Sequence, residues 1–95
     1  MLLHIKTAEY LHDYKIAVTF NNGQAGIADL ADALQGGVFE ALRNVEQFSQ
    51  VTVDAELETL VWPNGVDLAP EFVYYQAFKN EPELQQQFKN WGYTA

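Results

Sequence analysis

The sequence predicts an α+β protein: one small antiparallel sheet of about four to six strands, a short central helix, and two C-terminal helices packed on the sheet. Three observations predict this class. Residues 14–20 alternate with the period of a half-buried strand, and Asn22-Gly23 follows directly as a hairpin turn. Residues 51–62 contain a second pair of strand-like segments, and residues 70–92 have helical starts and spacings.

The N-terminal part is expected to form three antiparallel strands. Residues 3–11 are the weaker candidate, residues 14–20 the central strand, and residues 24–30 the return strand after the turn. An Asn-Gly pair supplies the positive φ of a tight hairpin at little steric cost. Three strands are the minimum for a sheet that is stable by itself.

Two short helical segments are expected next. Residues 32–37 allow one turn at most, because two glycines end it. Residues 38–43 are typical of a short helix, with Val38, Leu42 and Val45 on one side. This helix is the central helix of the predicted fold.

A second hairpin is expected from residues 51–54 and 58–62. Ser49, just before it, is expected on the solvent side of a strand. Trp62-Pro63-Asn64-Gly65 then predicts a turn, because Pro fits the second position of a type I turn and Gly the fourth.

Two helices are expected in the last third of the chain. Pro70 suits a first helical position, and Glu81-Pro82 starts a second helix by the same logic. Gly92 is placed to end that helix. The apolar stripe of the second helix is Leu84, Phe88 and Trp91. Residues 72–78 are apolar on nearly all sides, so we expect them to be covered by the sheet and by the second helix.

The charge of the chain excludes more functions than it suggests. Its 95 residues include 13 acidic and 5 basic side chains, no cysteine, and a net charge of −8. The bases are scattered, so direct nucleic-acid binding is not expected. No apolar run could cross a bilayer, and the N-terminus lacks the order of a signal peptide. A single cytoplasmic domain over residues 1–95 is expected, with no membrane contact.

Few residues are candidates for chemistry. Asp29 and Asp67 each follow an Asn-Gly turn and precede a leucine, an echo we interpret as convergent turn chemistry. Together they could share a proton or hold a cation, but Asp at such positions more commonly accepts backbone N–H groups. His4 and His12 lie too far apart along a strand to share a metal. Ser49 has no nucleophile motif. We therefore expect no enzyme, cofactor or metal site.

The aromatic residues are the better guide to function. They concentrate in the last third of the chain, and tryptophan and tyrosine dominate interface energetics. The candidate contact surface, for a partner protein or a homodimer, is Phe72, Tyr75, Phe78, Phe88 and Trp91.

Several of these motifs together resemble a known family. The alternating strand, Asn22-Gly23, Asp29-Leu30 and above all the Trp62–Glu71 segment (W-P-N-G-x-D-L-x-P-E) are similar to domain-of-unknown-function family 2442 over residues 3–75. The resemblance implies a small bacterial α+β protein with antiparallel strands and no established activity or cofactor. In some members a helix-turn-helix DNA-binding domain follows, and some are encoded beside small proteins suspected of toxin–antitoxin pairing. Residues 80–92 form a helical extension too short for such a domain.

Three functions remain open at this point. The first is a non-enzymatic protein-interaction or regulatory module, such as an antitoxin-like partner of a small basic protein. The second is a sensory domain that works with a separate helix-turn-helix DNA-binding protein. The third is a small ligand-binding protein or hydrolase that uses Asp29 and Asp67.

Overall fold

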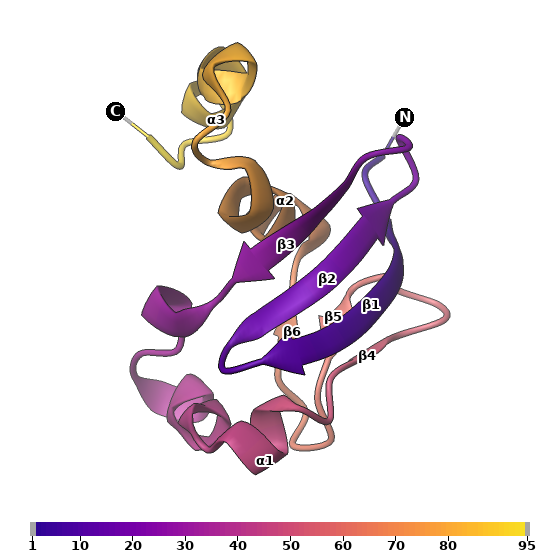
Figure 1. Cartoon of the computed structure of the whole chain (residues 1–95), viewed down its shortest axis with the longest axis vertical. Coiled ribbons are helices and arrows are strands. Elements are labelled where there is room, and N and C mark those ends of the chain that lie inside the picture. The colour runs from indigo at the N-terminus through magenta and orange to yellow at the C-terminus, as the bar shows by residue number, and fades with distance from the viewer. Residues whose placement is uncertain (1, 95) are drawn as a thin grey trace.

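The strands of this protein form two small sheets that face each other across the core (Figure 1). The structure is a computed structural model that describes residues 2–94. Both sheets are antiparallel and three-stranded, in the orders β1-β2-β3 and β4-β5-β6. The predicted α+β class is therefore confirmed, although the strands are divided between two sheets instead of forming one.

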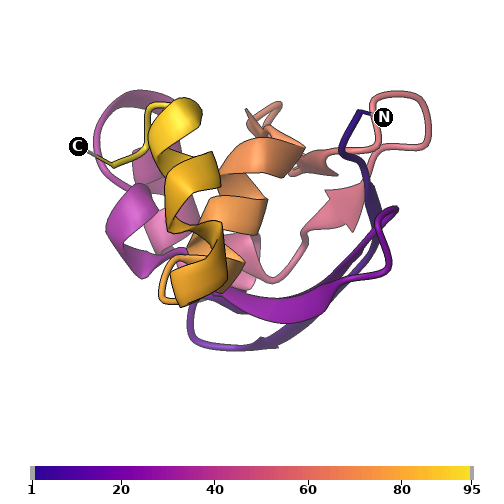
Figure 2. The ribbon, with the colours of Figure 1, turned by 90° about the horizontal axis from the view of Figure 1, so that it is seen from above.

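The first sheet consists of β1 (Ile5–His12), β2 (Lys15–Phe20) and β3 (Ala25–Asp29). These strands agree closely with the predicted segments. Alternate residues of β2 point inward and are buried, namely Ile16, Val18 and Phe20. The Asn-Gly turn joins β2 to β3, with Gly23 at a φ of +87°. The outer face of this sheet is not covered by a helix in residues 2–94 (Figure 2).

Asn21 fastens the N-terminal residues to this turn. Its backbone N–H donates to the His4 carbonyl at 3.0 Å, and its Oδ1 accepts from the His4 N–H at 2.9 Å. Its Nδ2 donates to the Leu2 carbonyl at 2.7 Å. The segment before β1 is thereby held against the β2–β3 turn.

The second sheet consists of three two-residue strands, β4 (Thr52–Val53), β5 (Leu60–Val61) and β6 (Asp67–Leu68). The predicted hairpin corresponds to β4 and β5. The predicted turn follows, with the Gly65 N–H donating to the Trp62 carbonyl at 3.0 Å. The strand β6 was not expected, because two residues are too few to show a period in the sequence.

The segment between the sheets is helical but differs from the prediction. It contains the 3-10 helices η1 (Ala31–Ala33) and η2 (Gly37–Arg43) and the short helix α1 (Val45–Phe48). Val38 and Val45 are 67% and 42% exposed, whereas Leu42 is buried. The predicted common face is therefore wrong, because a 3-10 helix has three residues per turn and a separate helix begins at Val45.

The expectation for Ser49 is also wrong. Ser49 lies directly after α1, and its hydroxyl donates to the Glu46 carbonyl at 2.8 Å. Asn44 caps the start of the same helix, since its side chain accepts the Glu46 N–H at 2.9 Å. The apolar residues on either side of Ser49 are spaced as in a helical turn. Over so few residues this spacing looks the same as the alternation of a strand.

The C-terminal helices are α2 (Pro70–Phe78) and α3 (Gln85–Asn90), preceded by the 3-10 turn η3 (Pro82–Leu84). The helix α2 packs on the first sheet, and α3 packs on α2 at one end of the molecule (Figures 1 and 2). A Cβ atom at Gly26 would lie 2.9 Å from the Phe78 ring, so glycine permits the close approach of α2 to β3. None of the helices in residues 2–94 is long and apolar enough to span a membrane.

The end of α3 agrees with the prediction. Gly92 has a φ of +88° and its N–H donates to the Lys89 carbonyl at 3.0 Å. The Tyr93 N–H donates to the Phe88 carbonyl at 3.0 Å. This pair of bonds is a Schellman motif, which requires a left-handed residue at the glycine.

Phe48 joins the two sheets. Its buried ring packs edge-on against Tyr14 and Tyr10 of the β1–β2 hairpin, at centroid distances of 5.3 and 6.0 Å. On the other side it lies 5.7 Å from the ring of Trp62, which follows β5. The indole N–H of Trp62 donates to the Phe48 carbonyl at 2.9 Å.

The substitution Trp62→Phe should lower the free energy of unfolding by about 2–4 kcal/mol, because it removes core volume and the indole hydrogen bond, which leaves the Phe48 carbonyl only the longer 3.3 Å bond from the Val51 N–H. Urea denaturation followed by far-UV circular dichroism measures the change. Trp91→Phe is the matched control: Trp91 is half-buried and its indole N–H is not bonded to residues 2–94, so the loss should stay below about 1.5 kcal/mol. Equal losses in the two variants would contradict the assigned role of the hydrogen bond.

Candidate functional site

The two aspartates that we considered as a carboxylate pair lie in separate sheets. Asp29 ends β3, where its Oδ1 accepts the Ala31 N–H at 3.1 Å and its Oδ2 lies 3.8 Å from Lys15 Nζ. Asp67 lies in β6 and is exposed. Neither lines any of five surface cavities in residues 2–94. The structure thus places Asp29 in a turn and gives the pair no shared site.

The histidines are also apart from each other. His4 precedes β1, and its Nδ1 lies 3.3 Å from the Glu58 carboxylate. His12 is exposed at the end of β1, with its Nδ1 3.2 Å from the Asp13 carboxylate. No group of three or more His, Asp or Glu side chains in the described part of the chain could hold a metal ion.

Glu58 links the sheets at the end opposite Phe48. Its carbonyl accepts the Ile5 N–H at 3.0 Å, and it has a φ of +55°. A left-handed conformation is costly for a residue with a Cβ atom, so the contacts around Glu58 offset local strain. The sequence offered no signal for this, because glutamate is not a residue typical of left-handed turns.

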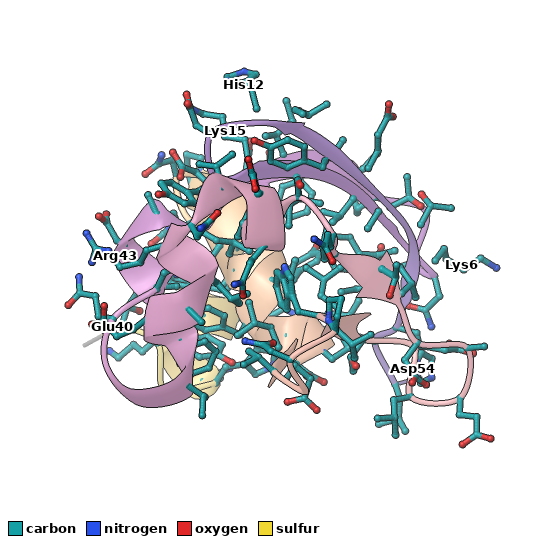
Figure 3. All side chains as sticks on the ribbon, turned by 90° about the horizontal axis from the view of Figure 1, so that it is seen from below. Lys6, His12, Lys15, Glu40, Arg43 and Asp54 are labelled. Carbon is teal, nitrogen blue, oxygen red and sulfur yellow. The ribbon has the colours of Figure 1, made fainter. Side chains whose placement is uncertain are left out.

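The basic side chains do not form one surface. Lys6, Lys15 and Arg43 point outward from separate places on the molecule (Figure 3). Lys79 and Lys89 lie on the C-terminal segment. Within residues 2–94 the basic side chains therefore form no stripe of the kind that binds a phosphate backbone.

The W-P-N-G segment has a structural role. Trp62 is buried, and Asn64 Oδ1 accepts the Val66 N–H at 3.2 Å within the turn. Pro63 and Gly65 fill the turn positions that the sequence predicted. A shallow cavity of about 360 Å³ borders Trp62 and Pro63, but it has no titratable side chain in its lining.

An aromatic cluster connects α2 with α3. Tyr75 stacks on Tyr93 at a centroid distance of 4.9 Å and meets Phe88 edge-on at 5.0 Å. Phe72 lies 5.9 Å from Tyr93, and Trp91 lies 6.0 Å from Phe88. The helix α3 therefore covers the second side of α2, as expected from the apolar circumference of residues 72–78.

The five residues of the predicted contact surface occupy different depths. Phe88 is fully buried and fixes α3 on α2, so in this structure it cannot touch a partner directly. The other four are half-buried, namely Phe72, Tyr75, Phe78 and Trp91. Tyr93, which was not in the predicted set, completes the cluster because the Schellman motif folds it back onto α2. The aromatic surface below means Phe72, Tyr75, Trp91 and Tyr93.

Tyr93 carries a perturbed hydroxyl. Burial, and to a smaller extent the carboxylate of Glu71, raise the pKa of Tyr93 above its ordinary value of about 10. Both causes disfavour the phenolate in the folded protein. The shift therefore bears on the folded protein at alkaline pH.

The family model described as "Protein of unknown function (DUF2442)" matches residues 5–79, which confirms the resemblance inferred from the motifs. The match ends at the end of α2, before η3. A search of curated proteins gave no match to this sequence.

One solved structure is similar over the whole chain. It is the crystal structure of Putative DNA Binding Protein NE0471 from Nitrosomonas europaea ATCC 19718, with a TM-score of 0.75 and 16% sequence identity. The alignment covers 100% of this chain and 64% of that one, so this chain spans less than two thirds of the length of NE0471. At this identity the similarity shows the fold alone.

Tyr93 should make the stability of the fold fall at alkaline pH. Below about pH 10 the phenol is neutral in both states and its stabilisation is fully present. As pH rises further, the unfolded chain ionises first, because its pKa is lower, and the free energy of unfolding decreases. Urea titrations between about pH 8 and 11 should show a smaller decrease for Tyr93→Phe and an intermediate one for Glu71→Gln. An unchanged decrease in Tyr93→Phe would refute the assignment.

Proposed function

The chain belongs to the DUF2442 family of proteins of unknown function, and from this premise we propose that it is a non-enzymatic protein-interaction module of the cytoplasm. Its partner is a second protein, such as a small basic toxin-like protein, or a second copy of the chain. The contact is made by the aromatic surface of α2 and α3. The observation that carries the proposal is the exposure of part of these four aromatic side chains.

The aromatic surface has the properties of a contact site. Tyrosine and tryptophan contribute large contact areas with few rotatable bonds, and they are enriched among residues that dominate binding energy. The residues are fixed by one another, with Tyr75 stacked on Tyr93 and Phe72 beside it. A rigid surface loses little side-chain entropy on binding. The net charge of −8 favours encounter with a basic partner.

A regulatory domain that works with a separate helix-turn-helix protein is the second candidate. The supporting observation is the similarity to NE0471, a protein named Putative DNA Binding Protein whose chain extends beyond the matched region. In this reading the acidic chain contacts the regulator and not the DNA, because its bases do not form a phosphate-binding surface.

Trp91→Ser should reduce partner binding or self-association by at least about tenfold, because loss of a central aromatic at an interface costs about 2 kcal/mol or more. The measurement is quantitative capture of interacting proteins with the tagged full chain at native expression, together with sedimentation equilibrium. Val38→Ser, on η2, is the control for loss of exposed apolar area and should leave binding unchanged. A chain recovered alone, and monomeric at 10.8 kDa, would contradict the proposal.

The second candidate predicts a different result. The purified chain should leave the mobility of its own upstream DNA unchanged, but should shift it further when a helix-turn-helix protein encoded nearby is already bound. Retention of this added shift in Trp91→Ser would separate the regulator contact from the aromatic surface. A shift produced by the chain alone would overturn the expectation of no direct nucleic-acid binding.

A further inference from the structure

Two cavities border the buried ring of Tyr74, between the β2–β3 turn and the C-terminal helical segment. The first, of about 340 Å³, has Tyr74, Phe78 and Leu84 as its apolar lining and Glu81 and Glu83 as its carboxylates. The second, of about 320 Å³, is lined by Tyr74, Trp91 and the carboxylate residue Glu71, among others. The β2–β3 turn and α3 lie at the same end of the molecule (Figure 1). We call the two cavities together the Tyr74 groove.

The groove is acidic. Neither cavity is lined by a Lys, Arg or His side chain, whereas three carboxylate residues line them. No ion pair within residues 2–94 involves Glu71, Glu81 or Glu83. The neighbouring cation, Lys79, has its Nζ directed at Gln76 Oε1 at 3.4 Å. The carboxylates therefore remain available to an external cation.

Tyr74 adds an unpartnered polar atom to the lining. Its side chain is only 5% exposed and is surrounded by aromatic rings, with Phe78 at 4.7 Å and Phe20 at 5.0 Å. Its hydroxyl makes no hydrogen bond to residues 2–94. Within that range the enclosed side-chain oxygen without a partner is Thr59 Oγ1, so the Tyr74 oxygen is not enclosed and reaches solvent. Tyr74 lines both cavities of the groove. A hydroxyl oxygen that reaches solvent and has no protein partner can accept a hydrogen bond from a group that enters the groove.

We propose that the Tyr74 groove binds an arginine side chain from a basic segment of a partner protein. A guanidinium is planar, so it can lie on the half-buried Phe78 ring and gain a cation–π interaction. Its N–H groups point outward in a fixed fork and can donate to the Glu81 and Glu83 carboxylates. One further N–H can donate to the Tyr74 hydroxyl oxygen. Lysine has no flat face and offers one charged centre, so the groove favours arginine.

This inference rests on the proposed interaction function and specifies it. The groove shares Trp91 with the aromatic surface, so a partner that covers the aromatic surface can extend a basic segment into the groove. The negative charge of the groove also attracts a basic segment before contact, and this attraction steers the segment toward the groove.

The test is a titration of the ¹⁵N-labelled full chain with an acetylated, amidated pentapeptide of alternating alanine and arginine, at about 150 mM salt. Amide shift changes should concentrate at Tyr74, Phe78, Glu81 and Glu83. The same peptide with glutamine in place of arginine should bind at least about tenfold more weakly. The variant Tyr74→Phe keeps the ring and should weaken the arginine peptide about threefold.

A pair of double variants separates the groove from the general charge. Glu81→Gln with Glu83→Gln should weaken the arginine peptide about tenfold. Glu46→Gln with Glu56→Gln removes the same two charges from exposed positions outside the groove, and should weaken it less than about twofold. Equal weakening by both double variants would overturn the site. Spermidine binding as tightly as the arginine peptide would overturn the assignment to a protein segment.

These experiments distinguish an error in the groove proposal from an error in the proposed interaction function. If the host partner is captured equally by the wild type and by Glu81→Gln with Glu83→Gln, the groove proposal is wrong and the interaction function stands. If the arginine peptide binds the groove but native expression yields no partner and no self-association, the interaction function is wrong.

Discussion

The burial of Phe48 is the interaction on which the fold depends most. The two sheets share no strand, and the second consists of strands too short to be stable on their own. Phe48 meets the β1–β2 hairpin with one part of its ring and Trp62 with another, while its carbonyl holds the Trp62 indole. A helix of four residues thus sets how two sheets lie against each other. The charged surface can vary with little effect on this arrangement.

The sequence predicted most of the fold because most of its signals are local. The alternation in β2, the Asn-Gly turns, Pro70 and Gly92 each act through their own φ values or their immediate neighbours. The division into two sheets could not be predicted, because β6 has two residues and its pairing with β5 is set by the turn and the core. The exposure of Val38 and Val45 was missed for a related reason, since the type of helix that forms there depends on Leu42 and Phe48 filling the core.

The candidate site was predicted only in part. An aromatic C-terminal region was evident from composition, but the depth of each ring depends on how α3 lies on α2. Phe88 and Trp91 differ in burial although both belong to the same apolar stripe. Tyr93 joins the cluster through a backbone motif outside the helix. The isolated Tyr74 hydroxyl is a property of tertiary packing, so no pattern in the sequence could have indicated it.

The attachment of the N-terminal segment to Asn21 has a consequence for motion. Leu2, Leu3, Asn21 and Asn22 all line the second cavity, and the bonds to Asn21 connect the two segments that carry them. Segments connected in this way open as one cooperative unit, and their amide protons exchange with solvent together. One wall of the groove is thus held together by its own hydrogen bonds, whereas the opposite wall is the aromatic stack of α2 and α3.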